Sequence, residues 1–132
     1  MAIQLSNGQI ITGKTTSLLS APAAALLNAL KILAEIKSEV HLISESMVES
    51  FYDLKSKLLG NSAPHLNANE VLIALSICTT INPTAQHILR QIPKLRNSEA
   101  HSTAILPQAD INIFHKLGVN ITCEPGYKKI AV

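Results

Sequence analysis

The stretch from Gly8 to Thr15, "GQIITGKT", matches the phosphate-loop pattern G-x-x-x-x-G-K-[ST] and raises the question of a nucleotide site. A phosphate loop wraps its backbone N–H groups around the anion, so the residues between its glycines must adopt tight, partly left-handed backbone. Here those residues are Gln, Ile, Ile and Thr, which favour an extended strand. Asn7-Gly8 between two β-rich runs predicts a hairpin, because both residues tolerate positive φ. We therefore favour a hairpin over a nucleotide-binding loop.

Three polar residues at and after the second half of this motif are the candidate ligand-binding residues. Lys14, Thr15 and Thr16 lead toward a predicted helix, and such a stretch could hold an anion weakly through hydroxyls and backbone amides. The alternative interpretation is a solvated loop without a ligand.

Four further residues are candidates for catalysis. His101 and Thr103 could share one face of a predicted strand, because alternate residues of a strand point to the same side. Cys123 and Glu124 end or follow another predicted strand, where α/β folds usually place ligands. For each residue a purely structural role is the alternative. The five histidines have no metal-ligand spacing, so no metal site is predicted, and no cofactor is indicated.

The composition indicates one domain spanning residues 1–132 that hides more surface than a small domain hides alone. Hydrophobic residues make up 47% of the chain and charged residues only 15%, which favours a partner or a further domain. The net charge of +2, scattered basic residues and 3% aromatics argue against nucleic acid. Cys78 and Cys123 form no C-x-x-C pair, which favours a reducing cytoplasm, and the apolar runs are too interrupted for a membrane span.

Strands alternate with helices along the chain, which predicts an α/β fold with a small mixed sheet that begins with the hairpin. The helix around 71–81 is apolar nearly all round, so we expect it at the centre of the fold or under a partner. Asn67 and Glu70 form a capping box for this helix. The remaining predicted elements are helices at 22–36, 48–60, 83–92 and 108–118, strands at 39–44, 100–106 and 119–123, and a β-rich tail after the turn "EPGY" at 124–127.

Several segments, in order, resemble the C-terminal part of a bacterial family catalogued as domain of unknown function 1846, or uncharacterised protein family 0371. These segments are "NGQIITGKT", "HLIS", "NEVLIALSICTTINPTAQ", "AHSTAIL" and "LGVNITCEP". The resemblance implies a three-layer α/β domain loosely similar in topology to cytidine deaminase domains, whose zinc signature is missing here, so their activity does not transfer. It also implies a fragment of a longer cytoplasmic protein whose N-terminal part resembles a nucleotide-binding region.

Two functional hypotheses follow from these observations. In the first, the chain is an accessory domain that packs against the missing N-terminal domain of its parent or against copies of itself, and helps to shape a ligand site. In the second, it binds or transforms a small anionic ligand on its own, at a site around Lys14, His101 and Cys123.

Overall fold

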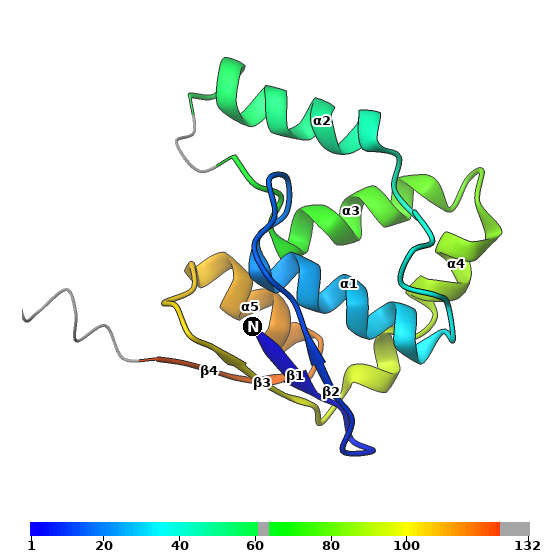
Figure 1. Cartoon of the computed structure of the whole chain (residues 1–132), viewed down its shortest axis with the longest axis vertical. Coiled ribbons are helices and arrows are strands. Elements are labelled where there is room, and N and C mark those ends of the chain that lie inside the picture. The colour runs from blue at the N-terminus through cyan, green and yellow to red at the C-terminus, as the bar shows by residue number, and fades with distance from the viewer. Residues whose placement is uncertain (61–63, 125–132) are drawn as a thin grey trace, which may run out of the picture.

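A computed structural model describes residues 1–60 and 64–124 of the chain, and a small mixed sheet forms its base (Figure 1). The order of the strands is β2-β1-β3-β4. β1 is antiparallel to both β2 and β3, whereas β3 and β4 are parallel, so β2, β3 and β4 end at the same edge of the sheet. The strands are β1 (Ala2–Gln4), β2 (Ile10–Thr12), β3 (Glu99–Ser102) and β4 (Asn120–Cys123). The predicted α/β class with a small mixed sheet is confirmed.

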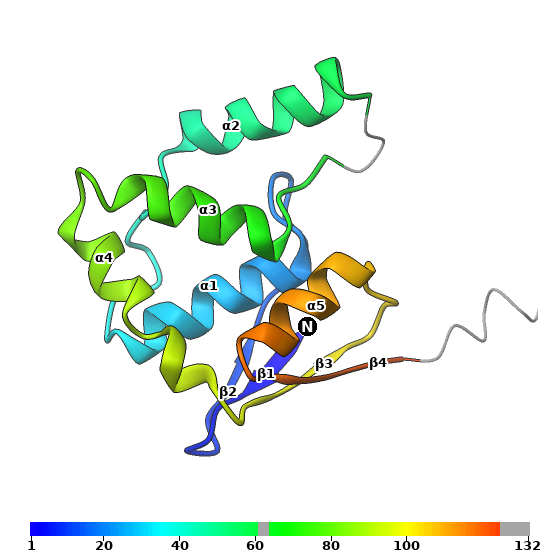
Figure 2. The ribbon, with the colours of Figure 1, turned by 180° about the vertical axis from the view of Figure 1, so that it is seen from behind.

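The helices stack on one side of this sheet (Figures 1 and 2). α1 contacts β1 and β2, and α5 contacts β4, whereas α3 lies against α1, α4 and α5. The sheet, the α1–α5 layer and the α3–α4 layer make three layers, and α2 lies outermost. The helices are α1 (Ala21–Leu33), α2 (Glu45–Asp53) with a π-helical continuation η1 (Leu54–Leu58), α3 (Ala68–Cys78), α4 (Pro83–Leu89), a 3₁₀ turn η2 (Ile92–Leu95) and α5 (Gln108–Lys116).

The phosphate-loop motif is the second half of a hairpin. β1 pairs with β2 in a register that places Ile3 opposite Ile11. Gly8 takes the left-handed backbone (φ 90°) and its N–H donates to the Leu5 carbonyl, while Asn7 keeps negative φ and its side chain accepts from the Gln9 N–H. The hairpin interpretation is confirmed, with a wider turn than the two-residue Asn-Gly type. A strand between the two glycines leaves no phosphate-wrapping loop there.

Side-chain caps fix where the helices begin, as the sequence predicts. The Ser20 hydroxyl accepts from the Ala23 N–H at the start of α1. At the start of α3, the Asn67 side chain accepts from the Glu70 N–H while the Glu70 carboxylate accepts from the Asn67 N–H. These bonds satisfy N–H groups that a helix cannot pair internally. They therefore hold the first turns of α1 and α3 in defined positions.

The strand expected at residues 39–44 is absent, and that prediction is wrong. The segment has no strand partner among the described residues, and it contributes buried Leu42 to the core instead. Burial therefore accounts for Leu42, whereas Val40 is 39% exposed, and composition alone does not separate side-chain burial from strand pairing. The predicted tail after residue 124 lies outside the described residues.

Gly13, directly after β2, lies against the backbone of α1 and gives a direct test of this packing. A Cβ at Gly13 would stand 2.2 Å from the Ala25 nitrogen, whereas a Cβ at Gly8 would meet nothing within 4 Å. We expect Gly13→Ala to destabilise the fold by at least about 3 kcal/mol, because backbone must move. Gly8→Ala, strained only by its positive φ, should cost about 1 kcal/mol. Urea unfolding of the two variants measures both costs, and equal values would contradict this packing.

Candidate ligand-binding site

A pocket of about 470 Å³ opens at the edge of the sheet where β2 and β3 end, and we call it the carboxyl-edge pocket. This volume lies within the range of small-molecule sites, and the carboxyl ends of strands are the usual place for ligands in α/β folds. Loops after β2 and β3 and the starts of three helices form its walls. Its polar lining consists of Thr15, Ser20, Lys55, His65, Asn67, Ser102 and Asp110.

Three helices begin at this pocket. Ser20 caps α1, Asn67 caps α3, and Pro107 precedes α5 without a side-chain cap. The first turn of a helix exposes backbone N–H groups and carries partial positive charge. The three starts therefore direct positive ends of peptide dipoles toward one cavity.

Lys55 brings a full positive charge to the pocket wall from the π-helical turn after α2. Its ammonium donates to the His65 carbonyl oxygen and to Glu70 Oε1, each at 2.7 Å. Only 13% of the side chain is exposed, so these bonds hold the ammonium in place. An ammonium carries three N–H groups, and these bonds use two of them.

Asp110 is a buried carboxyl group on the pocket wall, with 2% of the residue exposed. Its Oδ1 accepts from the Ala68 N–H at 3.2 Å, which ties α5 to the start of α3. No other described residue donates a hydrogen bond to this carboxyl group. Burial raises the pKa of Asp110 above its ordinary value of 3.8, opposed by the Ala68 hydrogen bond, while Glu70 adds to the rise and Lys55 lowers the pKa.

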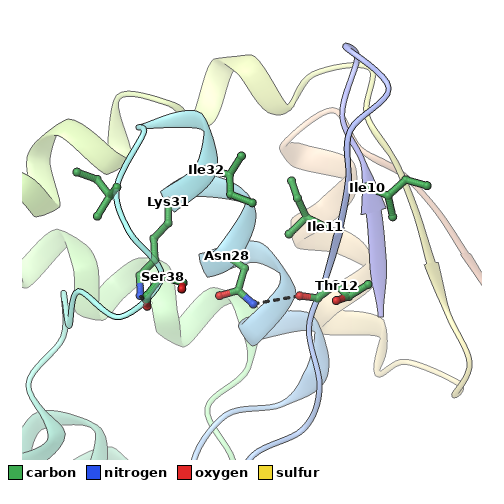
Figure 3. A pocket seen from close by; sticks show the side chains of 8 residues that line it. Ile10, Ile11, Thr12, Asn28, Lys31, Ile32 and Ser38 are labelled. Atoms are coloured by element: carbon green, nitrogen blue, oxygen red, sulfur yellow. Dashed lines mark hydrogen bonds between the residues drawn. The ribbon is translucent and has the colours of Figure 1, made fainter.

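A second pocket, of about 320 Å³, lies between β2 and α1 (Figure 3). Asn28 donates to the Thr12 carbonyl at 3.0 Å, and buried Lys31 donates to the Ser38 carbonyl at 3.0 Å. Burial lowers the pKa of Lys31, and Glu39 partly offsets this effect. These polar groups already bind main-chain oxygens, so they fasten the segment after α1 to the helix and are less suited to a ligand than the carboxyl-edge pocket.

The predicted catalytic residues lie on different sides of the sheet. His101 joins Thr122 (Nδ1 to Oγ1, 2.8 Å) and Glu124 (Nε2 to Oε1, 3.0 Å) on the exposed face. A chain of hydroxyl, imidazole and carboxylate can relay a proton, but about half of the His101 and Glu124 side chains is exposed to water. Cys123 alternates with Thr122 and points to the other face, and Thr103 is exposed beyond the end of β3. The structure therefore brings His101 and Glu124 together but not His101 and Cys123.

Of the predicted ligand-binding residues, only Thr15 lines the carboxyl-edge pocket. Lys14 is exposed, and the Thr16 hydroxyl accepts from the N–H groups of Leu18 and Leu19, which closes a turn. Sequence reasoning missed Lys55 and Asp110. A signal for Asp110 existed, since it lies four residues before Phe114 and so on the apolar side of its helix.

Residues 1–60 and 64–124 contain neither a candidate metal cluster nor a candidate membrane span. No group of three or more His, Cys, Asp and Glu side chains there could hold a metal ion. No helix in that part of the chain has the length and apolar character needed to cross a membrane.

The fold and pocket define a small α/β domain, and comparison with known proteins gives its family. Residues 1–132 match the family described as "Domain of unknown function DUF1846, C-terminal", and the chain belongs to this family. It is 45% identical over 127 residues to a "UPF0371 protein" of Clostridium botulinum (strain Langeland) and 44% identical to one of Clostridium tetani. Each match covers 96% of this chain and 25% of the relative. The chain thus spans about a quarter of the length of these curated relatives, and the expected family is confirmed.

The raised pKa of Asp110 predicts how the stability depends on pH. The folded state holds this proton more tightly than the unfolded chain, so its contribution to stability is present below pH 3.8 and is lost as the pH rises through the folded-state pKa. Asp110→Asn removes the titration and keeps an oxygen for the Ala68 N–H, so the stability of this variant relative to the original chain should rise with pH across this window. Urea unfolding from pH 3 to 7 measures the difference.

Asp53→Asn is the matched control, because Asp53 is 57% exposed and its pair with Lys57 spans 3.8 Å. Its stability should run parallel to that of the original chain. If the stability of Asp110→Asn also ran parallel to that of the original chain between pH 3 and 7, burial would not raise the pKa of Asp110.

Proposed function

We propose that this chain is an accessory C-terminal domain that docks onto the rest of a longer family protein and contributes the carboxyl-edge pocket to a ligand site. The observation that carries the proposal is an exposed apolar face on α3. Ile73 and Ile77 are 45% and 50% exposed, and Ile81 just beyond the helix is 86% exposed. We call these three residues the α3 stripe; their spacing of four places Ile73 and Ile77 on one side of the helix.

The opposite side of α3 explains why this stripe is not needed for folding. Val71, Leu75 and Cys78 are buried against the core, and α3 contacts α1, α4 and α5 through that side. The helix is therefore apolar on both sides, while the core of this domain covers only one. Because this helix is apolar nearly all round, we expected a partner to cover it, and the α3 stripe is the surface that such a partner would contact.

The segment that carries the α3 stripe is free of fixed charge. Residues 71–89 contain no Asp, Glu, Lys or Arg, although several of them, among them Ser76, Thr80 and Gln86, are exposed. Protein interfaces are depleted in charged residues at their centre, and large exposed apolar patches mark interaction sites. This surface therefore suits contact with another apolar protein surface.

The occupant we propose is the part of the longer family protein that lies outside this chain. The curated relatives are about four times as long as the segment they share with it, so a covalently linked surface would be held close at high effective concentration. A second copy of this chain is the competing occupant, and the experiment below separates the two.

A self-contained ligand-binding domain is the second candidate function. The observation that favours it is that the carboxyl-edge pocket already combines a fixed ammonium group, Lys55, with a volume of about 470 Å³, which lies within the range of small-molecule sites. A site combining Lys14, His101 and Cys123 has less support, because His101 and Cys123 occupy opposite faces of the sheet.

Docking is testable with a clostridial relative shortened by its C-terminal quarter. Titration of this protein with the 132-residue chain in a calorimeter should give saturable binding at a one-to-one ratio, with the relative's own C-terminal quarter as positive control. Ile77→Glu should weaken binding at least about tenfold, because it places a charge in the centre of an apolar contact.

Ile10→Glu is the matched control, since Ile10 is 65% exposed on β2 and alternates with buried Ile11, so its side chain points away from the helices that cover the sheet. It should leave the affinity unchanged. The proposal fails if the positive control binds and this chain does not, if Ile10→Glu weakens binding instead of Ile77→Glu, or if light scattering shows that the α3 stripe forms a homodimer.

A further inference from the structure

We propose that the carboxyl-edge pocket binds a small phosphate ester that carries a hydroxyl group near its phosphate. The inference deepens the proposed function and rests on its statement that this pocket belongs to a ligand site. Three independent features of the pocket carry it: converging helix starts, a fixed ammonium group and the buried Asp110 carboxyl group, whose Oδ2 accepts no hydrogen bond from the described residues.

The helix starts supply the part that recognises an anion. The first turns of α1, α3 and α5 line the cavity. The caps and Asp110 already bind the N–H groups of Ala23, Ala68 and Glu70, whereas α5 has no side-chain cap. Phosphate is bound in this way at helix N-termini because the N–H groups and the helix dipole act together. The N–H groups of Ala21 and Gln108 donate to no described residue and so remain for separate oxygens of one phosphate, while all three helix starts contribute partial positive charge.

Lys55 supplies a full positive charge for binding the phosphate. Its two bonds, to the His65 carbonyl and to Glu70, fix the ammonium at the wall and leave a third N–H for a ligand oxygen. The nearby Lys57 differs, since 75% of its side chain is exposed and it does not line this pocket. Of these two lysines, Lys55 is therefore the one positioned to bind the phosphate of a ligand.

Asp110 supplies the reason to expect a hydroxyl group beside the phosphate. The residue is 98% buried, and its Oδ1 binds the Ala68 N–H, yet no described residue donates to Oδ2. Because Asp110 lines the pocket and is otherwise enclosed by the domain, a donor for Oδ2 can reach it from the pocket. A ligand hydroxyl supplies that donor without adding a second negative charge.

The remaining lining fits a short carbon skeleton between these two polar groups. Pro22, Ala104, Leu106 and Pro107 form an apolar part of the wall, next to the hydroxyl of Thr15. The volume of about 470 Å³ accommodates a compound of a few carbons with its phosphate, and the opening lies at the domain surface where a docked partner could close it.

Nuclear magnetic resonance titration of the ¹⁵N-labelled 132-residue chain tests the inference, with glycerol 3-phosphate, inorganic phosphate and glycerol as probes. Glycerol 3-phosphate should shift the amide signals of Thr15, Ala21 and Gln108 in a saturable way. Inorganic phosphate should bind at the same amides but at least about tenfold more weakly, because it lacks the hydroxyl for Asp110, and glycerol should not bind.

Two matched lysine variants test whether the Lys55 ammonium binds the phosphate. Lys55→Met should weaken glycerol 3-phosphate binding at least about tenfold, and Lys57→Met should not change it. Because Lys55→Met also leaves Glu70 without its ion pair, Thr15→Val at an exposed position serves as a second pocket variant that keeps the fold, with an expected loss of about threefold.

The inference is overturned if no probe gives saturable shifts at these three amides, if both lysine variants lose affinity equally, or if phosphate binds as tightly as its glycerol ester. Ile77→Glu should bind the ester like the original chain. Loss of docking with retained ester binding would contradict the proposed docking alone, and retained docking without ester binding would contradict this inference alone.

Discussion

The burial of α1 on both of its sides is the constraint on which the rest of the structure depends. β1 and β2 pack against one side of the helix, and α3 and α4 pack against the other. Ala23, Ala25 and Ala29 are fully buried, and small side chains at these positions let the strand end at Gly13 approach the helix backbone. This close packing sets the distance between the layers, and hence the place where the starts of α1, α3 and α5 meet.

The carboxyl-edge pocket is a consequence of that layering. Ser20 begins α1 directly after the loop from β2, and an isolated bridge between Leu19 and Leu66 holds this loop beside the segment that leads into α3. Asp110 then joins α5 to the first turn of α3 through the Ala68 N–H. Local caps and one long-range carboxyl bond thus collect three helix starts around a single cavity, although the helices are far apart in the sequence.

Much of this fold could be predicted from the sequence, because its strongest signals are local. The Asn67–Glu70 capping box and the hairpin at Gly8 depend on residues within a few positions of each other, and both are confirmed. The prediction of a strand at residues 39–44 is wrong because a strand must pair with a neighbouring strand, and no local sequence pattern reveals whether one is present. The pocket depends on the same kind of distant information, since Lys55 and Asp110 become neighbours of Asn67 only after the helices pack.

The two surfaces of α3 link the proposed docking to the pocket. The first turn of the helix stands at the carboxyl-edge pocket, and its exposed side carries the α3 stripe from Ile73 to Ile81. A partner bound along this stripe would contact the same rigid helix whose N-terminus, fixed by the capping box and by Asp110, faces the ligand. Docking and ligand binding would then both stabilise one arrangement of α3, so each should strengthen the other by the same factor, as linkage requires.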